Sequence, residues 1–167
     1  LWKEAAELGS TPYLATTGDE REDVEITRVL GLAAFATGDT LGGLRKMVAL
    51  HERENHLQKQ RDAAVADADK KNREANKNAD EIARAKEQAA QNFADRLNQT
   101  RDVVGELAVA EKLAAGDLAG VKSRLAELRG VPDGRLASYH AAAGDLARAL
   151  ELARQAAAAI AKVNPSV

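Results

Sequence analysis

The chain has 167 residues, a formal net charge of −2, no cysteine, and an apolar content of 45% of which few residues are aromatic. The near-neutral charge excludes a general electrostatic attraction to nucleic acid or to anionic membranes. The lack of cysteine excludes disulfides, thiolate metal sites and a cysteine nucleophile. Because the apolar residues are mostly Ala and Leu, the composition favours close-packed helices and predicts an all-α protein.

The sequence carries no recognisable targeting or membrane-spanning segment. No run approaches the ~20 consecutive apolar residues that cross a bilayer. The first residues, Leu1 to Glu4, lack the basic region and apolar run of a secretory signal. The chain also begins without Met, which we interpret as a piece of a longer protein, so the compartment stays unassigned.

An N-terminal helical region is predicted for residues 1–48. Residues 1–8 indicate a short helix, and from about residue 20 to residue 37 apolar side chains recur at helical spacing. Gly38 then predicts the end of this helix, and Asp39 predicts the cap of the next one.

A Gly-Asp pair occurs three times in the chain, each time after an Ala-containing helical turn. Glycine adopts the left-handed conformation that ends a helix, and the aspartate side chain accepts hydrogen bonds from the free N–H groups of the next helix. Each pair therefore predicts an antiparallel helical hairpin, and the recurrence indicates an internal repeat. The pairs are Gly38-Asp39, Gly116-Asp117 and Gly144-Asp145.

These hairpins resemble the tetratricopeptide repeat, a family in which small residues lie where two helices cross. The third hairpin matches best, through Leu136, Ala137, Gly144, Ala149 and Ala156. The resemblance implies a stack of short antiparallel hairpins that binds other proteins.

The sequence departs from that family in its aromatic positions and in its spacing. His140 stands where the family usually has Tyr, and the 28 residues from Asp117 to Asp145 are fewer than the family's usual period. The 78 residues from Asp39 to Asp117 are far more. We interpret the excess as an insertion between the first two hairpins.

The insertion predicts a long antiparallel coiled-coil arm over residues 49–104, between the N-terminal region and further helical hairpins over residues 105–167. Residues 72–78 are the predicted tip, because this Asn-rich stretch lacks large apolar residues and Asn tolerates a left-handed turn. Asp80 is the predicted cap of the returning helix.

Heptad spacing of apolar residues supports the pairing of the two arm helices. If residues whose numbers sum to about 154 face each other, Leu57 lies opposite Leu97 and Ala64 opposite Ala90. The alternative, which the sequence leaves open, is one continuous helix from residue 39 to residue 115 that lies against a second copy in a dimer.

No catalytic, cofactor-binding or metal-binding residue is predicted. His51 and His56 are five residues apart, which places their imidazoles about 140° apart on a helix and not on one face. His140 is expected to be partly buried at a helix crossing. Without a Gly-rich phosphate loop or a Ser/His/Asp set, the sequence predicts a protein that is not an enzyme.

The arm tip is the one candidate contact site that the sequence offers. Lys70, Lys71, Arg73 and Lys77 outnumber Glu74 locally, so the tip can touch an acidic partner. Acidic residues on both flanks restore the charge balance and no aromatic residue is available to stack on bases, which disfavours nucleic acid and membranes.

The predicted function is a protein–protein interaction or scaffold module, with the arm as a spacer or docking surface. Its partner is another protein or a second copy of itself, and no small-molecule substrate is evident. The alternative is a structural protein that assembles through its long helices. Nucleic-acid binding through the basic tip is a third hypothesis.

Overall fold

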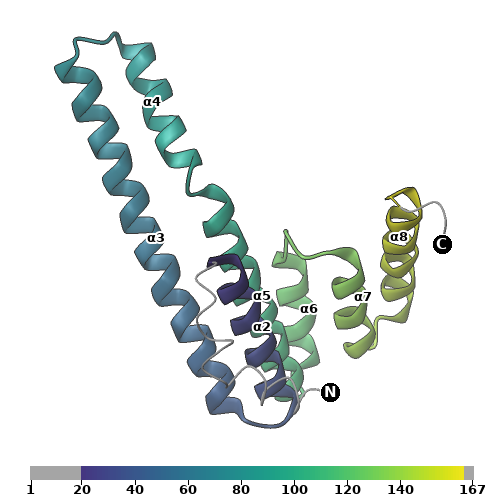
Figure 1. Cartoon of the computed structure of the whole chain (residues 1–167). Coiled ribbons are helices and arrows are strands. Elements are labelled where there is room, and N and C mark those ends of the chain that lie inside the picture. Colours follow the sequence, from purple (N-terminus) through teal and green to yellow (C-terminus); the bar gives the residue numbers. More distant parts are fainter. Residues whose placement is uncertain (1–19, 164–167) are drawn as a thin grey trace.

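The computed structural model describes the backbone of residues 20–163 and the side chains of residues 23–162, and all regular structure in that part of the chain is helical (Figure 1). The all-α prediction is confirmed, whereas the predicted helix over residues 1–8 lies outside the described residues. No helix within the described part is long and apolar enough to span a bilayer. The helices are α2 (Glu20–Ala36), α3 (Thr40–Glu74), α4 (Ala79–Gln91), α5 (Ala94–Ala114), α6 (Leu118–Glu127), α7 (Asp133–Ala142) and α8 (Leu146–Val163).

A two-limbed arm rises from a helical body (Figure 1). Helix α3 runs from the body to the tip, and α4 followed by the first part of α5 returns beside it. In the body, α2 packs on both α3 and α5, α6 packs on α5, and α7 packs on α8. Helices α3 and α5 pass without interruption through residues 48–49 and 104–105, where the sequence predicts the boundaries of the arm.

The three Gly-Asp turns have the predicted conformation. Gly38, Gly116 and Gly144 have φ values of 84°, 71° and 78°, in the left-handed region. The N–H of the following aspartate reaches back to a carbonyl five residues earlier, as from Asp39 to Ala34 at 2.8 Å, which is the Schellman arrangement. The aspartate side chains then cap the next helices: they accept from the N–H groups of Gly42 (2.8 Å), Gly120 (2.8 Å) and Arg148 (3.3 Å).

The arm tip uses the same helix ending with asparagine in place of glycine. Asn76 has φ 52°, and the Lys77 N–H donates to the Asn72 carbonyl at 3.0 Å. Asn78, and not the predicted Asp80, caps α4 through a capping box with Glu81. The prediction of Asp80 is wrong because the left-handed Asn76 completes the reversal early and leaves Asn78 extended, in the capping position.

The return limb is divided in two, whereas the sequence predicts an unbroken helix. The Phe93 N–H donates to the Ala90 carbonyl (3.2 Å), three residues back, which tightens the turn between α4 and α5. The Arg96 guanidinium lies 4.9 Å from the centre of the Phe93 ring. Asn92 and Phe93 both have a weaker helix propensity than the Ala, Lys and Glu residues before them, which favours a break here.

The two limbs keep one register on both sides of that break. Arg101 Nε lies 2.6 Å from Glu54 Oε1 below the break, and Lys86 Nζ lies 3.4 Å from Asp69 Oδ1 above it. The residue numbers of each pair sum to 155, within one of the predicted value. Continuous pairing across the break means that the turn redirects the backbone without shifting the return limb along α3.

Two apolar clusters form the core of the body. The first joins α2, α3 and α5, and a Cβ on Gly31 would lie 2.6 Å from Leu107 Cδ2, so α2 and α5 cross closely there. The second joins α5, α6 and the turn after α7. The buried residues of the first cluster are Val24, Leu32, Phe35, Leu50, Val103, Leu107 and Ala110, and those of the second are Val109, Val121, Leu125 and Ala143.

Candidate functional site

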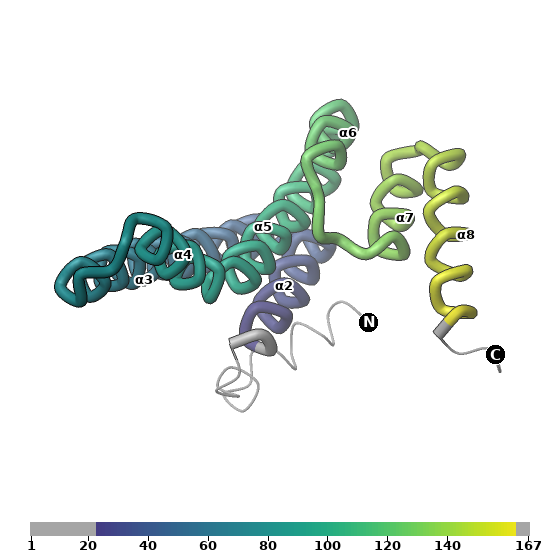
Figure 2. Tube along the Cα trace, turned by 90° about the horizontal axis from the view of Figure 1, so that it is seen from above, coloured from purple at the N-terminus to yellow at the C-terminus, as the bar shows by residue number. Residues whose placement is uncertain are grey.

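A groove of 790 Å³ lies between α2, the C-terminal half of α5 and α7. Each of these is the first helix of its hairpin, and the groove thus borders all three hairpins of the body. Seen from above, α7 lies on the same side of α5 as α2 does (Figure 2). The lining residues are Arg28, Leu32, Phe35, Ala36, Gly38, Thr40, Ala110, Leu113, Ala114, Arg135, Ser138, Tyr139 and Ala142.

The floor of the groove is apolar and well supported. Leu32 and Phe35 come from the buried face of α2, and Ala110 and Leu113 come from the facing surface of α5. A Cβ on Gly43 would lie 2.5 Å from the Phe35 ring, so the glycine lets α3 hold this ring from behind. An apolar floor of this kind suits the side chains of a ligand rather than water.

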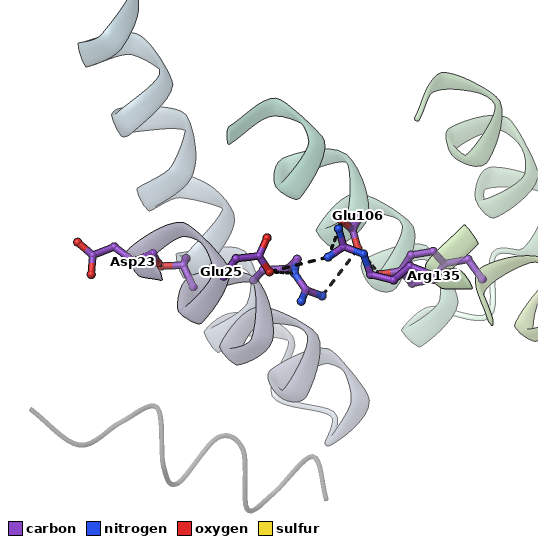
Figure 3. Close-up of polar contacts among 7 residues, drawn as sticks. Asp23, Glu25, Glu106 and Arg135 are labelled. Atoms are coloured by element: carbon purple, nitrogen blue, oxygen red, sulfur yellow. Dashed lines mark hydrogen bonds and ion pairs between the residues drawn. The ribbon is translucent and has the colours of Figure 1, made fainter. Parts of the chain in front are cut away.

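A buried carboxylate, Glu106, lies beside the groove at the point where α2, α5 and α7 meet. Its side chain has no exposed surface, and Tyr139 donates a hydrogen bond of 2.9 Å to its Oε2 atom. Arg135 Nη1 lies 3.4 Å from Oε1, and Arg28 Nη1 lies 3.9 Å from Oε2. Two guanidinium groups, one from α2 and one from α7, therefore approach one carboxylate, and Figure 3 labels Arg135 and Glu106 of this set.

A second carboxylate, Glu25, completes the polar cluster. Arg28 Nε donates to Glu25 Oε2 at 2.7 Å, and Arg135 Nη1 approaches the same oxygen to 3.8 Å. The two arginines thus join α2 to α7 through both carboxylates, as Figure 3 shows for Glu25, Glu106 and Arg135. The cluster stands where the first and third hairpins approach each other, at the edge of the groove.

Burial raises the pKa values of Glu106 and Tyr139 in this cluster. Loss of hydration raises the pKa of Glu106, although the Tyr139 hydroxyl and the two arginines oppose that shift. Burial likewise raises the pKa of Tyr139, with a further contribution from the Glu106 charge, so this phenol stays protonated as a donor. Among the described residues, Glu106 Oε1 is a buried oxygen without a hydrogen-bond partner. The arginines therefore hold Glu106 as ion pairs without a bidentate hydrogen bond.

Sequence analysis missed this cluster entirely. Its signal is the acidic Glu106 among Val103, Leu107 and Ala110, in the spacing of one buried helix face. A charged residue in such a position has a partner in the fold, and Arg28 and Arg135 supply it from sequence positions far from Glu106. Spacing along the chain gives no indication of that contact.

The four basic residues predicted at the tip lie at the far end of the arm, away from the groove. Their side chains are largely exposed, and each pairs with a carboxylate four residues away. The hydrogen bond from Lys71 to Asp67 raises the pKa of that lysine. The pairs are Lys70–Glu74 (3.9 Å), Lys71–Asp67 (2.7 Å), Arg73–Asp69 (2.8 Å) and Lys77–Glu81 (3.4 Å). The tip is thus locally charge-balanced.

The three histidines lie on α3 and α7. His140 is partly buried, and its Nδ1 atom lies 3.1 Å from Asp145 Oδ2. The Arg148 backbone N–H and His140 lower the pKa of Asp145. His51 lies 3.7 Å from Glu54, and His56 is exposed on α3. Within residues 20–163, no three His or acidic side chains gather in a way that would hold a metal ion.

Compared with known proteins, the chain matches no protein-family model, no curated protein and no solved structure. A functional assignment therefore depends on the groove, the polar cluster and the arm.

Proposed function

We propose that the protein is a non-enzymatic interaction module that binds a peptide segment of another protein in the groove between α2, α5 and α7. The observation that carries this proposal is the pairing of an apolar floor with two arginines at its edge. Small concave sites with a few converging polar groups are the usual places of ligand binding.

The arrangement of the hairpins supports a likeness to tetratricopeptide repeats. In a stack of such hairpins the first helices face one side, and here α2, α5 and α7 together line the groove. The repeated Gly-Asp endings give each hairpin the same local turn. On this proposal the arm is an insertion within the first two hairpins.

The chemistry of the groove favours a peptide with apolar side chains and a carboxylate. Leu32, Phe35 and Leu113 offer the apolar contacts. Arg28 and Arg135 present planar guanidinium groups, which match a carboxylate in shape and charge. Because Glu106 lies beneath them with a raised pKa, an incoming anion competes with a carboxylate that is itself poorly hydrated.

The arm acts as a spacer in this proposal. Helix α3 has 35 residues, which at 1.5 Å per residue spans about 50 Å. Since its tip cations are already paired, we assign the tip a secondary contact with a protein partner and no role in nucleic-acid binding.

The proposal is tested with a random peptide library selected on the full chain, followed by fluorescence anisotropy of a selected labelled peptide. Ala142 and Ala141 are adjacent exposed residues on α7, but only Ala142 lines this groove. Ala142→Glu should weaken peptide binding at least tenfold, because the new side chain fills the groove and its negative charge repels the carboxylate of the peptide. The Ala141→Glu variant should bind the peptide as the wild type does. Equal effects of both substitutions would refute the groove as the binding site.

A self-assembling structural protein is the competing function. It predicts a stable dimer or larger species at all protein concentrations used for peptide binding. Light scattering distinguishes the two, because the interaction module is expected to remain an elongated monomer.

A further inference from the structure

We propose that the groove between α7 and α8 is a second docking site, which takes one amphipathic α-helix of another protein through a bulky apolar side chain. This groove has a volume of 600 Å³ and is lined from both helices without a charged side chain. It shares only Ser138 with the groove between α2, α5 and α7. The docking site is therefore additional to the peptide groove of the proposed function.

Helix α8 lies at the outer end of the body, beside α7 (Figure 2). Its residues Ala149 and Leu152 are buried. On the side that lines the groove, Leu150 is 53% exposed and Ile160 is 62% exposed. Exposed apolar surface that surrounds a groove is typical of a site for another protein.

The equivalent surface is covered by a helix in each of the other two hairpins. Four lining positions lie six and three residues before the turn glycine, and nine and twelve residues after it. In the first hairpin the residues at these positions pack with Val103, Leu107 and Ala110 of α5. In the second hairpin, three of them belong to the cluster that also includes Leu136 and Tyr139 of α7. The residues are Leu32, Phe35, Met47 and Leu50 in the first hairpin, Ala110, Leu113, Leu125 and Leu128 in the second, and Ser138, Ala141, Ala153 and Ala156 in the third.

The chain thus shows twice that a helix fits this surface of a hairpin. Within residues 20–163, no further helix packs on the third hairpin in the way that α5 packs on the first. The ligand that the groove fits is therefore a helix, with apolar residues on successive turns of one face.

The small residues of the third hairpin determine the size of the side chain that fits. In the first two hairpins, Leu107 and Leu136 pack against walls made mostly of Leu, Phe and Met. In the third hairpin the same four positions hold one Ser and three Ala. A leucine would leave a gap there, whereas an aromatic ring would fill the space to the density of a protein interior.

The ends of the groove indicate that the docking face is uncharged. In the first hairpin, Glu54 lies 2.6 Å from Arg101 of α5, and Arg28 lies 3.9 Å from Glu106 of α5. At the same distances from the turn glycine, the third hairpin has Ile160 and Gly134. The partner helix therefore needs no charged residue to match the ends of this groove.

A second copy of the chain fits the groove less well. Among the described residues, the large apolar side chains that are exposed are all Leu, Val or Ile, as in Leu41, Leu44 and Val48 on α3. None of them is larger than the leucines that fill the other two hairpins. An aromatic residue must therefore come from a protein of different sequence.

The test uses a fluorescein-labelled helical peptide of Ala, Glu and Lys that carries Leu, Phe and Leu at positions i, i+4 and i+7. A matched peptide has Ala in place of Phe. By fluorescence anisotropy, the full chain should bind the Phe peptide roughly tenfold more tightly than the Ala peptide or better, as expected for a buried aromatic anchor.

Paired substitutions locate the peptide on the protein. Ala141 and Ala157 line the groove from α7 and from α8, whereas their exposed neighbours Ala142 and Ala158 do not line it. Ala141→Glu and Ala157→Glu should each weaken binding of the Phe peptide roughly tenfold or more, because a carboxylate then enters an apolar site. Ala142→Glu and Ala158→Glu should leave it unchanged. Circular dichroism verifies that each variant stays helical.

A further variant tests the size of the groove. Ala153→Leu places in the third hairpin the residue that the second hairpin has at the same position, Leu125. It should weaken binding of the Phe peptide and reverse the preference toward a peptide with Leu at the central position. An unchanged preference for Phe would contradict the proposed fit.

Three other results would overturn the proposal. The first is equal or absent binding of the Phe and Ala peptides. The second is a loss of binding in Ala142→Glu but not in Ala141→Glu, which would place the peptide in the groove between α2, α5 and α7. The third is a wild-type dimer in sedimentation that Ala141→Glu and Val48→Glu both dissociate, which would assign the α7–α8 groove to a second copy.

Discussion

The body and the arm are both helical, yet they are stabilised in different ways. In the body, Leu107, Val109 and Val121 have no exposed surface. In the arm, α4 has no buried residue at all. Burial of apolar surface contributes about 25 cal/mol per Å², so the body carries most of the folding free energy. A long helical projection can therefore persist on little core of its own.

Local features replace burial near the tip of the arm, beyond the buried Leu57 and Leu97. The Asn78–Glu81 capping box begins α4, and exposed ion pairs four residues apart run along α3 near the tip. Two pairs, Glu54–Arg101 and Asp69–Lys86, join the limbs. Such contacts are individually weak and are screened by salt. The arm should therefore open before the body unfolds.

The strongest way to separate the two regions is to remove a large side chain from each. Leu107→Ala should lower the free energy of unfolding by about 2–5 kcal/mol, because it leaves a cavity where α2 and α5 cross. Ile82→Ala, at a half-buried position on α4, should cost much less. Urea denaturation followed by circular dichroism measures both, and equal losses would show that the arm has a core like that of the body.

The next effect concerns the polar cluster that joins the hairpins of the body. Tyr139→Phe removes the hydrogen bond to Glu106 and leaves a buried carboxylate oxygen unsatisfied. We expect a loss of about 1–3 kcal/mol in the free energy of unfolding. An unchanged urea midpoint would mean that water reaches Glu106.

The same cluster gives the body a pH dependence opposite in sign to that expected from Asp69 in the arm. Because the pKa of Glu106 is raised above 4.5, the folded protein holds this proton more tightly than the unfolded chain does. Its contribution is complete below pH 4.5 and is lost as the pH rises through the raised folded value. The stability of the wild type relative to Glu106→Gln should therefore fall with rising pH over that window.

Two other carboxylates affect the stability of the protein at lower pH. Their effect is the same in the wild type and in Glu106→Gln, so it cancels when the two are compared. The pKa values of Asp69 and Asp145 are lowered in the folded protein, by Arg73 and by the Arg148 N–H respectively. Their stabilisation is present above their usual pKa and is lost as the pH falls through the lowered values. Both proteins share it, so a difference that rises with pH would contradict the assignment to Glu106.

A smaller effect is expected at the arm tip. Asn78→Ala removes the cap of α4 and should cost about 1 kcal/mol. The loss should appear as faster amide hydrogen exchange in α4 and the end of α3, with exchange in the body unchanged. Faster exchange throughout the chain would mean that arm and body unfold as one unit.

The smallest effect on stability is expected from the ion pairs that join the two limbs of the arm. Lys86→Ala removes the ion pair with Asp69 that joins α4 to α3. Exchange in α4 should rise slightly at low salt and match the wild type at high salt, because screening already weakens the pair. A difference that persists at high salt would point to lost packing of the lysine stem.

Many of the helix ends and the long helices of the arm can be predicted from the sequence, because they depend on residues that are neighbours along the chain. Gly38, Gly116 and Gly144 end helices through a conformation that glycine alone adopts easily, and the following aspartates cap through neighbouring N–H groups. The long Gly- and Pro-poor stretch likewise predicts long helices. The break at Asn92 and Phe93 was missed because weak propensities do not fix where a helix ends.

The candidate site was not predictable in the same way. Glu106 shows as an anomaly on a buried helix face, but its partners Arg28, Arg135 and Tyr139 are brought to it only by the packing of three hairpins. The tip residues were predicted as a contact site because charged residues are evident in a sequence, and that role stays a prediction. The ion pairs that balance the charges of these tip residues depend on side-chain rotamers, which the amino-acid composition does not show.

The uninterrupted α3 and the divided return limb make the arm mechanically asymmetric. Helix α3 is anchored in the body by Leu50 and Leu57, and it continues as one piece to the tip. The opposite limb has a joint at Asn92–Phe93, where the helical hydrogen-bond ladder is interrupted. A sideways force on the tip is therefore transmitted along α3 into the body, while the return limb bends first at its joint.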